Sequence, residues 1–331
     1  MAKTVLGVDV GHDSLKLALC KGDRVKKAVT VPMPKNLVKE GRVVSTETMG
    51  ELIKTTMREH GIRAGRAAYV LPNDVIYVRN CTMPKMTEEQ LLYNIPYEFN
   101  DYITDELKNY VFDYAMLSSE AELKNDELTN MELMAVAVQS SVLDDTREIL
   151  RKAGLKMVMA GPAVSAFVNI IRNHEKKTGE VDREYCMLDL GYNSIRMYMF
   201  KGQRHMVTRI LEIGLSTLDQ AIADAFNVDI HLAHTYLTTD YDGCQRRDFC
   251  MNSYNNIAVE LMRALNFYRF SNGDSNLEDI WLCGGGAVIE PLRTAIKDTL
   301  DMNVHSAEEL IDTTQVDDGY SYIQAAGITM Q

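Results

Sequence analysis

The chain has 331 residues, of which 46% are hydrophobic and 25% charged, and its formal net charge at pH 7 is −12. This mixture is typical of a folded globular protein, excludes a disordered or collagen-like chain, and suggests about two domains. The acidic balance argues against a nucleic-acid partner. No apolar run reaches the roughly 20 residues that cross a bilayer, so we expect no direct membrane insertion. The six cysteines contain no CxxC pair, which predicts reduced core thiols and a cytoplasmic protein.

Hydrophobic patterning predicts alternating strands and helices in the first half of the chain. Strands are expected at 5–10, 15–20, 24–31, 68–71, 75–81, 111–117 and 131–138. Helices are expected at 46–60, from Thr87 onward behind a capping box, and at 141–153. The polar stretch 118–130 predicts a long hairpin loop. The block at about 75–150 therefore indicates an inserted α+β subdomain.

The second half begins again with a buried strand. Strands are expected at 185–190, 195–200, 205–213 and 279–283, and helices at 217–226, 230–237, 254–270 and 288–300. Cys244 and Cys250 are expected in a polar loop. We expect a first lobe at 1–162, a second lobe at 163–310, and a segment 311–331 that returns to the first lobe.

One segment of the chain occurs twice. Residues 8–16 align without gaps to residues 188–196, 180 positions later. Each copy places an aspartate at the end of a strand, a glycine in the turn and a serine after it. These residues are Asp9, Gly11 and Ser14 in the first copy, and Asp189, Gly191 and Ser194 in the second. One such turn alone is common hairpin punctuation, but two in register indicate a shared role.

The chemistry of these turns favours a phosphate ligand. A tight glycine turn exposes backbone N–H groups to an anion, and serine hydroxyls and Lys16 add donors and charge. Asp9 and Asp189 are expected to hold Mg²⁺, through its bound waters. Three glycines between the strand at 279–283 and the next helix would let the backbone lie against a nucleoside, or would simply form a flexible turn. The residues expected around ATP or ADP are Asp9, Gly11, His12, Asp13, Ser14, Lys16, Asp189, Gly191, Asn193, Ser194, Gly214, Gly284, Gly285 and Gly286.

These three motifs, in this order, resemble the actin-like ATPase superfamily. The resemblance implies that 7–11 is phosphate-1, 188–191 is phosphate-2 and 284–286 is the adenosine motif. Four further segments resemble the PilM family of type IV pilus assembly proteins, which is related to FtsA; these are 69–79, 83–91, 95–98 and 265–269. The resemblance implies an α/β, ribonuclease H-like duplicated fold with two lobes, an FtsA/PilM-type insertion in the first, and a nucleotide between them.

The resemblance also implies a function. A PilM-like protein would be a cytoplasmic ATP-binding adaptor, recruited to the inner face of the membrane by PilN and other pilus platform proteins. The cytoplasmic N-terminal peptide of PilN would dock on the insertion, and the residues expected to bind it are Leu91, Leu92, Ile95, Tyr97 and Phe99. Self-association is left open.

The sequence departs from the superfamily at two places. Gly161 stands where a carboxylate or glutamine often orients the attacking water, so we expect slow or absent hydrolysis and assign no catalytic residue. His234 and Leu237 stand where Glu and Lys often flank the adenosine, which leaves the base preference open. A small-molecule kinase on the same fold and an FtsA-like filament protein are the alternatives. Gly161 argues against the kinase. A basic amphipathic tail is expected of an FtsA-like protein, and the sequence ends without one, which argues against the filament protein.

Overall fold

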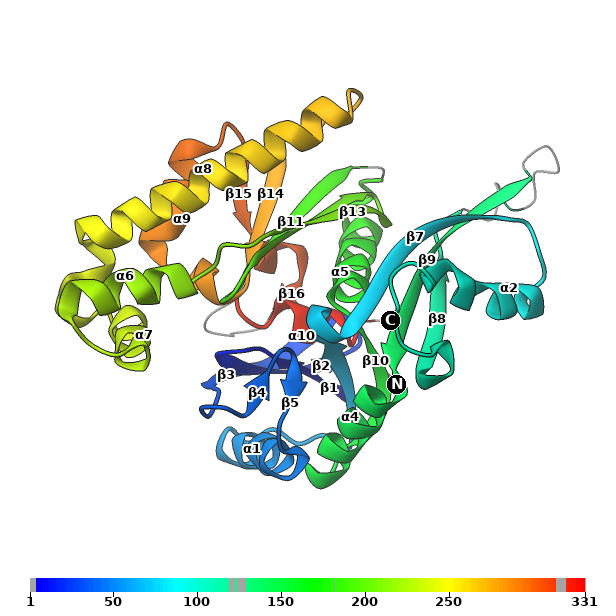
Figure 1. Cartoon of the computed structure of the whole chain (residues 1–331), viewed down its shortest axis with the longest axis horizontal. Coiled ribbons are helices and arrows are strands. Elements are labelled where there is room, and N and C mark those ends of the chain that lie inside the picture. Colours follow the sequence, from blue (N-terminus) through cyan, green and yellow to red (C-terminus); the bar gives the residue numbers. More distant parts are fainter. Residues whose placement is uncertain (1–3, 119–122, 124–128, 182, 314–319, 331) are drawn as a thin grey trace. The chain divides into compact units, whose positions relative to one another are not determined.

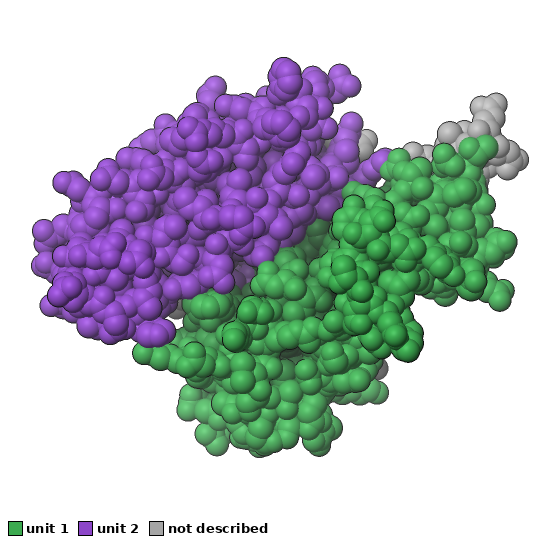
Figure 2. Space-filling model, viewed as in Figure 1, with its two compact units in different colours: residues 1–22, 31–169, 324–331 green, residues 23–30, 170–323 purple. Residues whose placement is uncertain are grey.

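The computed structural model describes residues 4–118, 123, 129–181, 183–313 and 320–330. The chain divides into two compact units, which Figure 2 colours separately. Unit 1 contains residues 1–22, 31–169 and 324–331, and unit 2 contains residues 23–30 and 170–323. Among the described residues, no helix is both long enough and apolar enough to span a membrane.

A six-stranded sheet joins strands from the first half of the chain to one short strand near its C-terminal end. Its strands are β1 (Thr4–Val10), β2 (Ser14–Lys21), β3 (Arg24–Pro32), β6 (Arg66–Leu71), β10 (Lys156–Pro162) and β16 (Asp312–Thr313), in the order β10-β6-β1-β2-β3-β16. β1 runs antiparallel to β2 and parallel to β6. The centre of this sheet is buried, because β1, β2 and β6 carry nearly continuous apolar side chains.

Three helices and the first turns of a fourth, which continues into unit 2, pack beside the strands of unit 1 (Figure 1). α1 (Thr46–Glu59) contacts α4 (Ser140–Lys152), and a Cβ added at Gly50 would lie 2.5 Å from the Lys152 Cβ. α10 (Ile323–Gly327) approaches β1 so closely that a Cβ added at Gly7 would overlap the Ala325 carbonyl. The first turns of α5 (Ala163–Thr178) bind α10, because the Asn169 amide donates to the Gly327 carbonyl at 3.0 Å. Glycine is therefore required where these backbones meet.

The inserted block forms a small α+β subdomain in unit 1. Its antiparallel sheet has the order β7-β9-β8, from β7 (Ile76–Pro84), β8 (Tyr110–Met116) and β9 (Asn130–Gln139). A capping box at Thr87 begins α2 (Glu88–Asn94), which continues into the 3₁₀ helix η2 (Ile95–Phe99). Four short elements complete the described part of unit 1: the hairpin of β4 (Val38–Lys39) with β5 (Arg42–Val43), and the 3₁₀ helices η1 (Asn73–Val75) and η3 (Leu107–Asn109). Most of the hairpin loop expected at 118–130 lies outside the described residues.

Unit 2 contains a five-stranded sheet of order β13-β12-β11-β14-β15. Its strands are β11 (Glu184–Leu190), β12 (Ile195–Lys201), β13 (Arg204–Leu211), β14 (Asp279–Cys283) and β15 (Asn303–Ser306). The β11–β12 antiparallel pair and the parallel neighbour β14 repeat the arrangement of β1, β2 and β6. The sequence duplication is therefore also a duplication of strand pairing.

Helices cover the sheet of unit 2 through one large apolar core. They are α6 (Ser216–Phe226), α7 (Ile230–Thr239), α8 (Asp248–Ser271) and α9 (Glu290–Thr299), with the 3₁₀ helices η4 (Tyr241–Arg246), η5 (Gly285–Val288) and η6 (Ala307–Leu310). α8 begins six residues before the expected 254, so the expectation of a polar loop around Cys250 was wrong. Cys250 is buried one turn before Tyr254, and Cys244 is buried in η4. Polar residues around Cys250 hide the helical period in the sequence.

Candidate functional site

The first DxG turn joins β1 to β2 in unit 1. Asp9 and Lys16 face each other across this strand pair, and Lys16 Nζ lies 3.6 Å from Asp9 Oδ2. Lys16 is buried, and a Cβ added at Gly11 would lie 2.6 Å from its Nζ. The β ladder therefore fixes one ammonium group beside the turn glycine, where the sequence predicts a phosphate contact.

Hydrogen bonds fix the shape of this turn. The Gly11 N–H donates to the Ser14 carbonyl at 2.9 Å, and the Asp13 carbonyl accepts from the Met33 N–H at 2.8 Å. Ser14 is buried, with its hydroxyl 3.4 Å from an Asp13 carboxylate oxygen, whereas His12 is exposed. The bulk of His12 thus lies at the surface of unit 1.

A buried tyrosine lies beneath Asp9. Tyr69 on β6 is paired with Val8, next to Asp9 in the parallel ladder. Burial, and then the Asp9 carboxylate, raise the pKa of the Tyr69 phenol, so it stays protonated. The phenol therefore adds no charge beside Asp9 and Lys16.

The second DxG turn, in unit 2, repeats the strand register of the first but not its hydrogen bond. Asp189 faces Arg196 across β11 and β12, the position that Asp9 and Lys16 hold in the first copy. The Gly191 N–H donates to the Asp189 carbonyl at 3.1 Å, and a Cβ added at Gly191 would lie 2.6 Å from the Ser194 carbonyl oxygen. Ser194 is buried and Asn193 is exposed.

Gly214 packs closely against the backbone of this second turn. A Cβ added there would lie 2.3 Å from the Tyr192 carbonyl oxygen and 2.8 Å from the Ser194 nitrogen. The next two residues bind the turn through their backbone, because Leu215 N–H donates to Gly191 at 3.2 Å and Ser216 N–H donates to Tyr192 at 2.9 Å. The segment that leads into α6 is therefore packed against the predicted phosphate-binding backbone.

The glycine triplet packs on the same corner of unit 2. Gly284 has φ 87° and ψ 172°, a conformation that is almost restricted to glycine. A Cβ added at Gly284 would lie 2.3 Å from Asp189 Oδ1, and one at Gly286 would lie 2.8 Å from the Leu190 Cβ. The helix expected from residue 288 is split, since η5 covers Gly285–Val288 and α9 begins at Glu290. Pro291 in the first turn of α9 favours that start.

Sequence reasoning missed a polar chain beside the second turn. His234 Nδ1 lies 2.9 Å from Asp219 Oδ2, and Asp219 is fully buried on α6. The other Asp219 oxygen has no hydrogen-bond partner among the described residues. The Tyr192 ring contacts His234 edge-on, with 5.6 Å between ring centroids. The available signal was a carboxylate on the otherwise apolar α6 face of Leu218 and Ile222. Leu237, predicted beside the adenosine, belongs to the core.

Each of the two aspartates, within its own unit, provides the kind of ligand that a hydrated magnesium ion accepts. The described residues contain no group of three or more His, Cys, Asp or Glu side chains arranged to hold a metal. Asp9 and Asp189 each provide one partly buried carboxylate at the end of a strand. Mg²⁺ binds proteins through one or two carboxylates, with water and substrate phosphates completing its octahedron. When bound, the ion would neutralise phosphate charge.

The residues expected to bind a partner fall into two groups, one buried and one exposed. Leu91, Ile95 and Phe99 are 2%, 0% and 0% exposed and form the core of the insertion with its strands. Leu92 and Tyr97 are 49% and 53% exposed. The structure brings the first three together as packing residues and leaves the last two on the surface.

Comparison with known proteins identifies the family. The model of the family described as type IV pilus assembly protein PilM matches residues 7–319. The chain belongs to this family. A PilM–PilN type IV pilus biogenesis complex has a solved chain that is 25% identical, with a TM-score of 0.81, covering 98% of this chain and 97% of that one. A search of curated proteins found no match.

Two more distant structures share the fold. The ethanolamine utilization protein EutJ from Carboxydothermus hydrogenoformans has a TM-score of 0.60 at 12% identity, covering 100% of this chain and 90% of that one. MreB5 of Spiroplasma citri bound to ADP has a TM-score of 0.50 at 11% identity, covering 99% and 95%. The predicted actin-like, duplicated α/β fold and the predicted PilM family are thereby confirmed.

Proposed function

We propose that this chain is a cytoplasmic nucleotide-binding adaptor of the type IV pilus platform, which binds the cytoplasmic N-terminal peptide of PilN. The observation that carries the proposal is the match to the PilM family over residues 7–319, together with the similarity to a solved PilM–PilN complex. Hydrolysis is slow or absent, so the nucleotide acts as a ligand that favours one conformation rather than as a substrate.

ATP binding is supported by the two turns. In unit 1, Lys16 is held beside Gly11 and supplies a positive charge for a phosphate. In unit 2, Gly214 and Gly284 pack against the turn that begins at Asp189. We propose that each turn contributes phosphate contacts to Mg-ATP, and that Asp9 and Asp189 bind waters of the ion.

Calorimetry of Mg-ATP binding tests this proposal. Asp9→Ala and Asp189→Ala each remove a carboxylate from the ion's surroundings, so affinity should fall at least tenfold and lose its dependence on Mg²⁺. Asp274→Ala is the matched control, since Asp274 is an exposed aspartate in a turn of unit 2. Unchanged Mg-ATP affinity in both site variants would overturn the nucleotide assignment.

Slow hydrolysis is supported by Gly161 at the end of β10. Orienting the attacking water contributes much of the rate of phosphoryl transfer, and glycine has no side chain to do so. A Cβ at this position would make only ordinary contacts, 3.6 Å from Ile328 Cδ1 and 3.6 Å from Met159 Cε. Phosphate release by the pure protein should therefore stay near the protein-free rate, and rapid release that survives Gly161→Ala would show that another residue orients the water.

Peptide docking on the insertion is supported by exposed apolar side chains and by charge. Leu92, Tyr93 and Tyr97 are exposed on α2 and η2, and the Tyr93 and Tyr97 rings lie 5.9 Å apart. The net charge of −12 attracts basic residues that flank aliphatic anchors of a peptide. We propose that the exposed residues contact PilN, and that Leu91, Ile95 and Phe99 support them from the core.

A further inference from the structure

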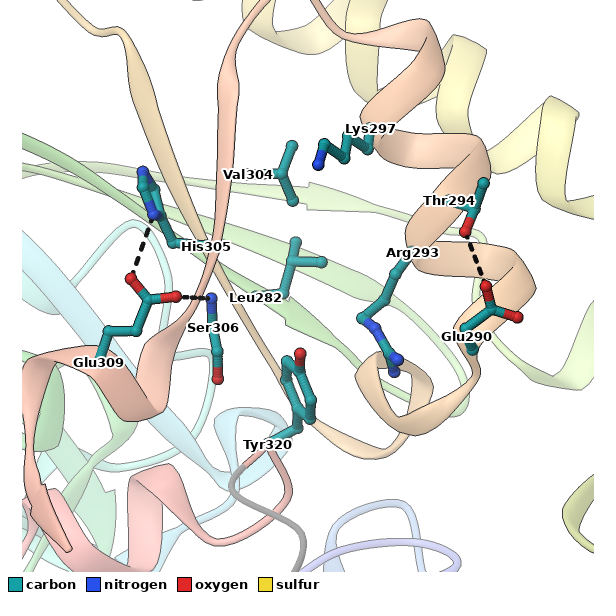
Figure 3. A pocket seen from close by; sticks show the side chains of 10 residues that line it. All are labelled: Leu282, Glu290, Arg293, Thr294, Lys297, Val304, His305, Ser306, Glu309 and Tyr320. Atoms are coloured by element: carbon teal, nitrogen blue, oxygen red, sulfur yellow. Dashed lines mark hydrogen bonds and ion pairs between the residues drawn. The ribbon is translucent and has the colours of Figure 1, made fainter.

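A cavity in unit 2 is lined by none of the residues of the two turns or of the glycine triplet, although the carbonyl of its lining residue Tyr320 accepts from the Gly284 N–H at 3.0 Å. It is open to solvent on one side, has a volume of about 270 Å³, and is lined by one side of α9, the edge strand β15, η6 and Tyr320 (Figure 3). Leu282 and Val304 form its apolar floor. Its size is close to the lower end of small-ligand pockets, which suits a compact molecule rather than a nucleotide or a folded partner.

Two cations face this cavity from successive turns of α9. Figure 3 shows Lys297 directed toward Val304 and Arg293 directed toward Tyr320. The Arg293 guanidinium donates to the Ala287 carbonyl and lies 4.9 Å from the centroid of the Tyr320 ring, so its position is fixed on both sides. Among the described residues, neither cation has a carboxylate within ion-pair distance.

The two carboxylates of the cavity wall are already bound to other groups. Glu290 pairs with Arg246 at 3.1 Å, outside the cavity, and accepts from the Thr294 hydroxyl at 3.2 Å. Glu309 lies 3.2 Å from His305 Nδ1 and accepts from the Ser306 N–H at 3.1 Å. The wall therefore carries two cations that no described carboxylate pairs with, one carboxylate that Arg246 offsets from outside, and Glu309 as the one remaining negative charge. Counted with Arg246, these described charges leave a small positive excess, in a chain whose net charge is −12.

We propose that this cavity binds a small anion through a phosphate or carboxylate group. The anionic group would lie between Arg293 and Lys297, where a guanidinium held in one orientation and a mobile ammonium provide complementary donors. Leu282 and Val304 would contact the apolar body of the ligand. The proposal does not depend on nucleotide binding, because none of the residues predicted to bind ATP lines this cavity.

The single tryptophan of the chain reports on this cavity. Trp281 stacks on His305, with 5.5 Å between ring centroids and 22° between ring planes, and His305 lines the cavity. A ligand that changes the surroundings of His305 should therefore change Trp281 fluorescence. Trp281 and the cavity both lie in unit 2, so the fluorescence change reports on that unit.

The test is a titration of the full chain with inorganic phosphate and, separately, with citrate, at constant ionic strength. Both calorimetry and Trp281 fluorescence are followed in the unmodified chain, in Lys297→Gln and in Lys176→Gln. Lys176 is the matched control, as another exposed lysine in the last turn of a helix of unit 2. All titrations are repeated with saturating Mg-ATP, which occupies any phosphate-binding nucleotide site.

We expect saturable binding of at least one probe, weakened at least fivefold by Lys297→Gln and unchanged by Lys176→Gln or by Mg-ATP. Phosphate alone would indicate a phosphate ligand, and citrate alone would indicate a carboxylate ligand. Absence of saturation with both probes, or equal affinity in Lys297→Gln, would overturn the proposal. Binding that disappears with Mg-ATP would assign the anion to the nucleotide site and would equally overturn it.

Discussion

Glycines at the second turn are required by contacts rather than by flexibility. Gly284 combines a backbone conformation that side chains disfavour with a Cβ direction blocked by the Asp189 carboxylate and the Leu190 carbonyl. Gly154 also has a positive φ, of 78°, but a Cβ there would meet nothing within 4 Å. A side chain at Gly154 would therefore meet backbone strain alone, whereas a side chain at Gly284 would meet both backbone strain and a steric conflict.

Gly284→Ala should cost clearly more than Gly154→Ala in the free energy of unfolding. The Gly154 variant carries only the left-handed strain of about 1–2 kcal/mol. The Gly284 variant must also displace Asp189 or Leu190, so we expect at least about 3 kcal/mol in total and weaker Mg-ATP binding. Urea unfolding and calorimetry measure both. An equal loss of unfolding free energy in the two variants would mean that Asp189 and Leu190 move aside to admit the new side chain, which contradicts this prediction.

His205 makes the stability of unit 2 depend on pH. Burial lowers the pKa of this imidazole to about 4, and its Nε2 lies 2.9 Å from the Thr208 hydroxyl. In the unfolded chain a histidine titrates near 6.5, so between about pH 6.5 and pH 4 the unfolded state binds a proton that the folded state does not. The contribution of His205 to the unfolding free energy is therefore fully present above pH 6.5 and is lost as the pH falls toward 4.

This loss should reach at most about 1.4 kcal/mol per pH unit over that window. His205→Gln should flatten the dependence of the unfolding free energy on pH, measured by urea unfolding between pH 7 and pH 4.5. The exposed His231→Gln is the control and should keep the slope of the unmodified chain. An unchanged slope in His205→Gln would show that folding does not lower the pKa of His205.

At the scale of elements, the sequence predicts the repeated strand–turn–strand units well. The boundaries of β1, β2, β11 and β12 follow short apolar runs that end at turn residues, and the register within each pair follows from the tight turn. The sequence predicts Lys16 as a phosphate contact. Its ion pair with Asp9 forms because the strand register places the two residues opposite each other. These are local properties, which one sequence can reveal.

Elements whose boundaries depend on tertiary packing were missed. β10 and α5 follow each other directly at Pro162, without the polar linker that would have marked two elements. β15 has only four residues, and it is recognisable as a strand only through its parallel pairing with β14. The burial of Leu91, Ile95 and Phe99 could not be predicted, because a helical spacing does not say which partner covers the apolar side.

Leu91 and Leu92 on α2 provide a matched pair for the insertion. Leu91→Ala opens a cavity in the core of the insertion and should cost about 2–5 kcal/mol in unfolding free energy. Leu92→Ala truncates a side chain that is 49% exposed and should change stability by less than about 0.5 kcal/mol. Thermal and urea unfolding of both variants check this. A large loss in Leu92→Ala would mean that its side chain packs in the core, and would remove it as a partner contact.

At the scale of the whole molecule, family and fold were predictable because the two turns and the glycine triplet occur in a fixed order along the chain. The lobe boundaries predicted at 162 and 310 remain predictions. The division into compact units instead follows contacts, which assign residues 324–331 to unit 1 and residues 23–30 to unit 2. The cavity of unit 2 that is proposed to bind an anion could not be predicted, because its charge depends on which carboxylates are already paired.

The most direct test of the adaptor function is a titration of the cytoplasmic N-terminal peptide of PilN against the full chain, with and without Mg-ATP. We predict saturable binding that weakens at least fivefold in Leu92→Ala/Tyr97→Ala, and a five- to 150-fold difference in affinity between the two conditions, the usual range of allosteric coupling. Absence of saturable binding in both conditions would contradict the proposed function, and equal affinity in both would contradict its control by nucleotide.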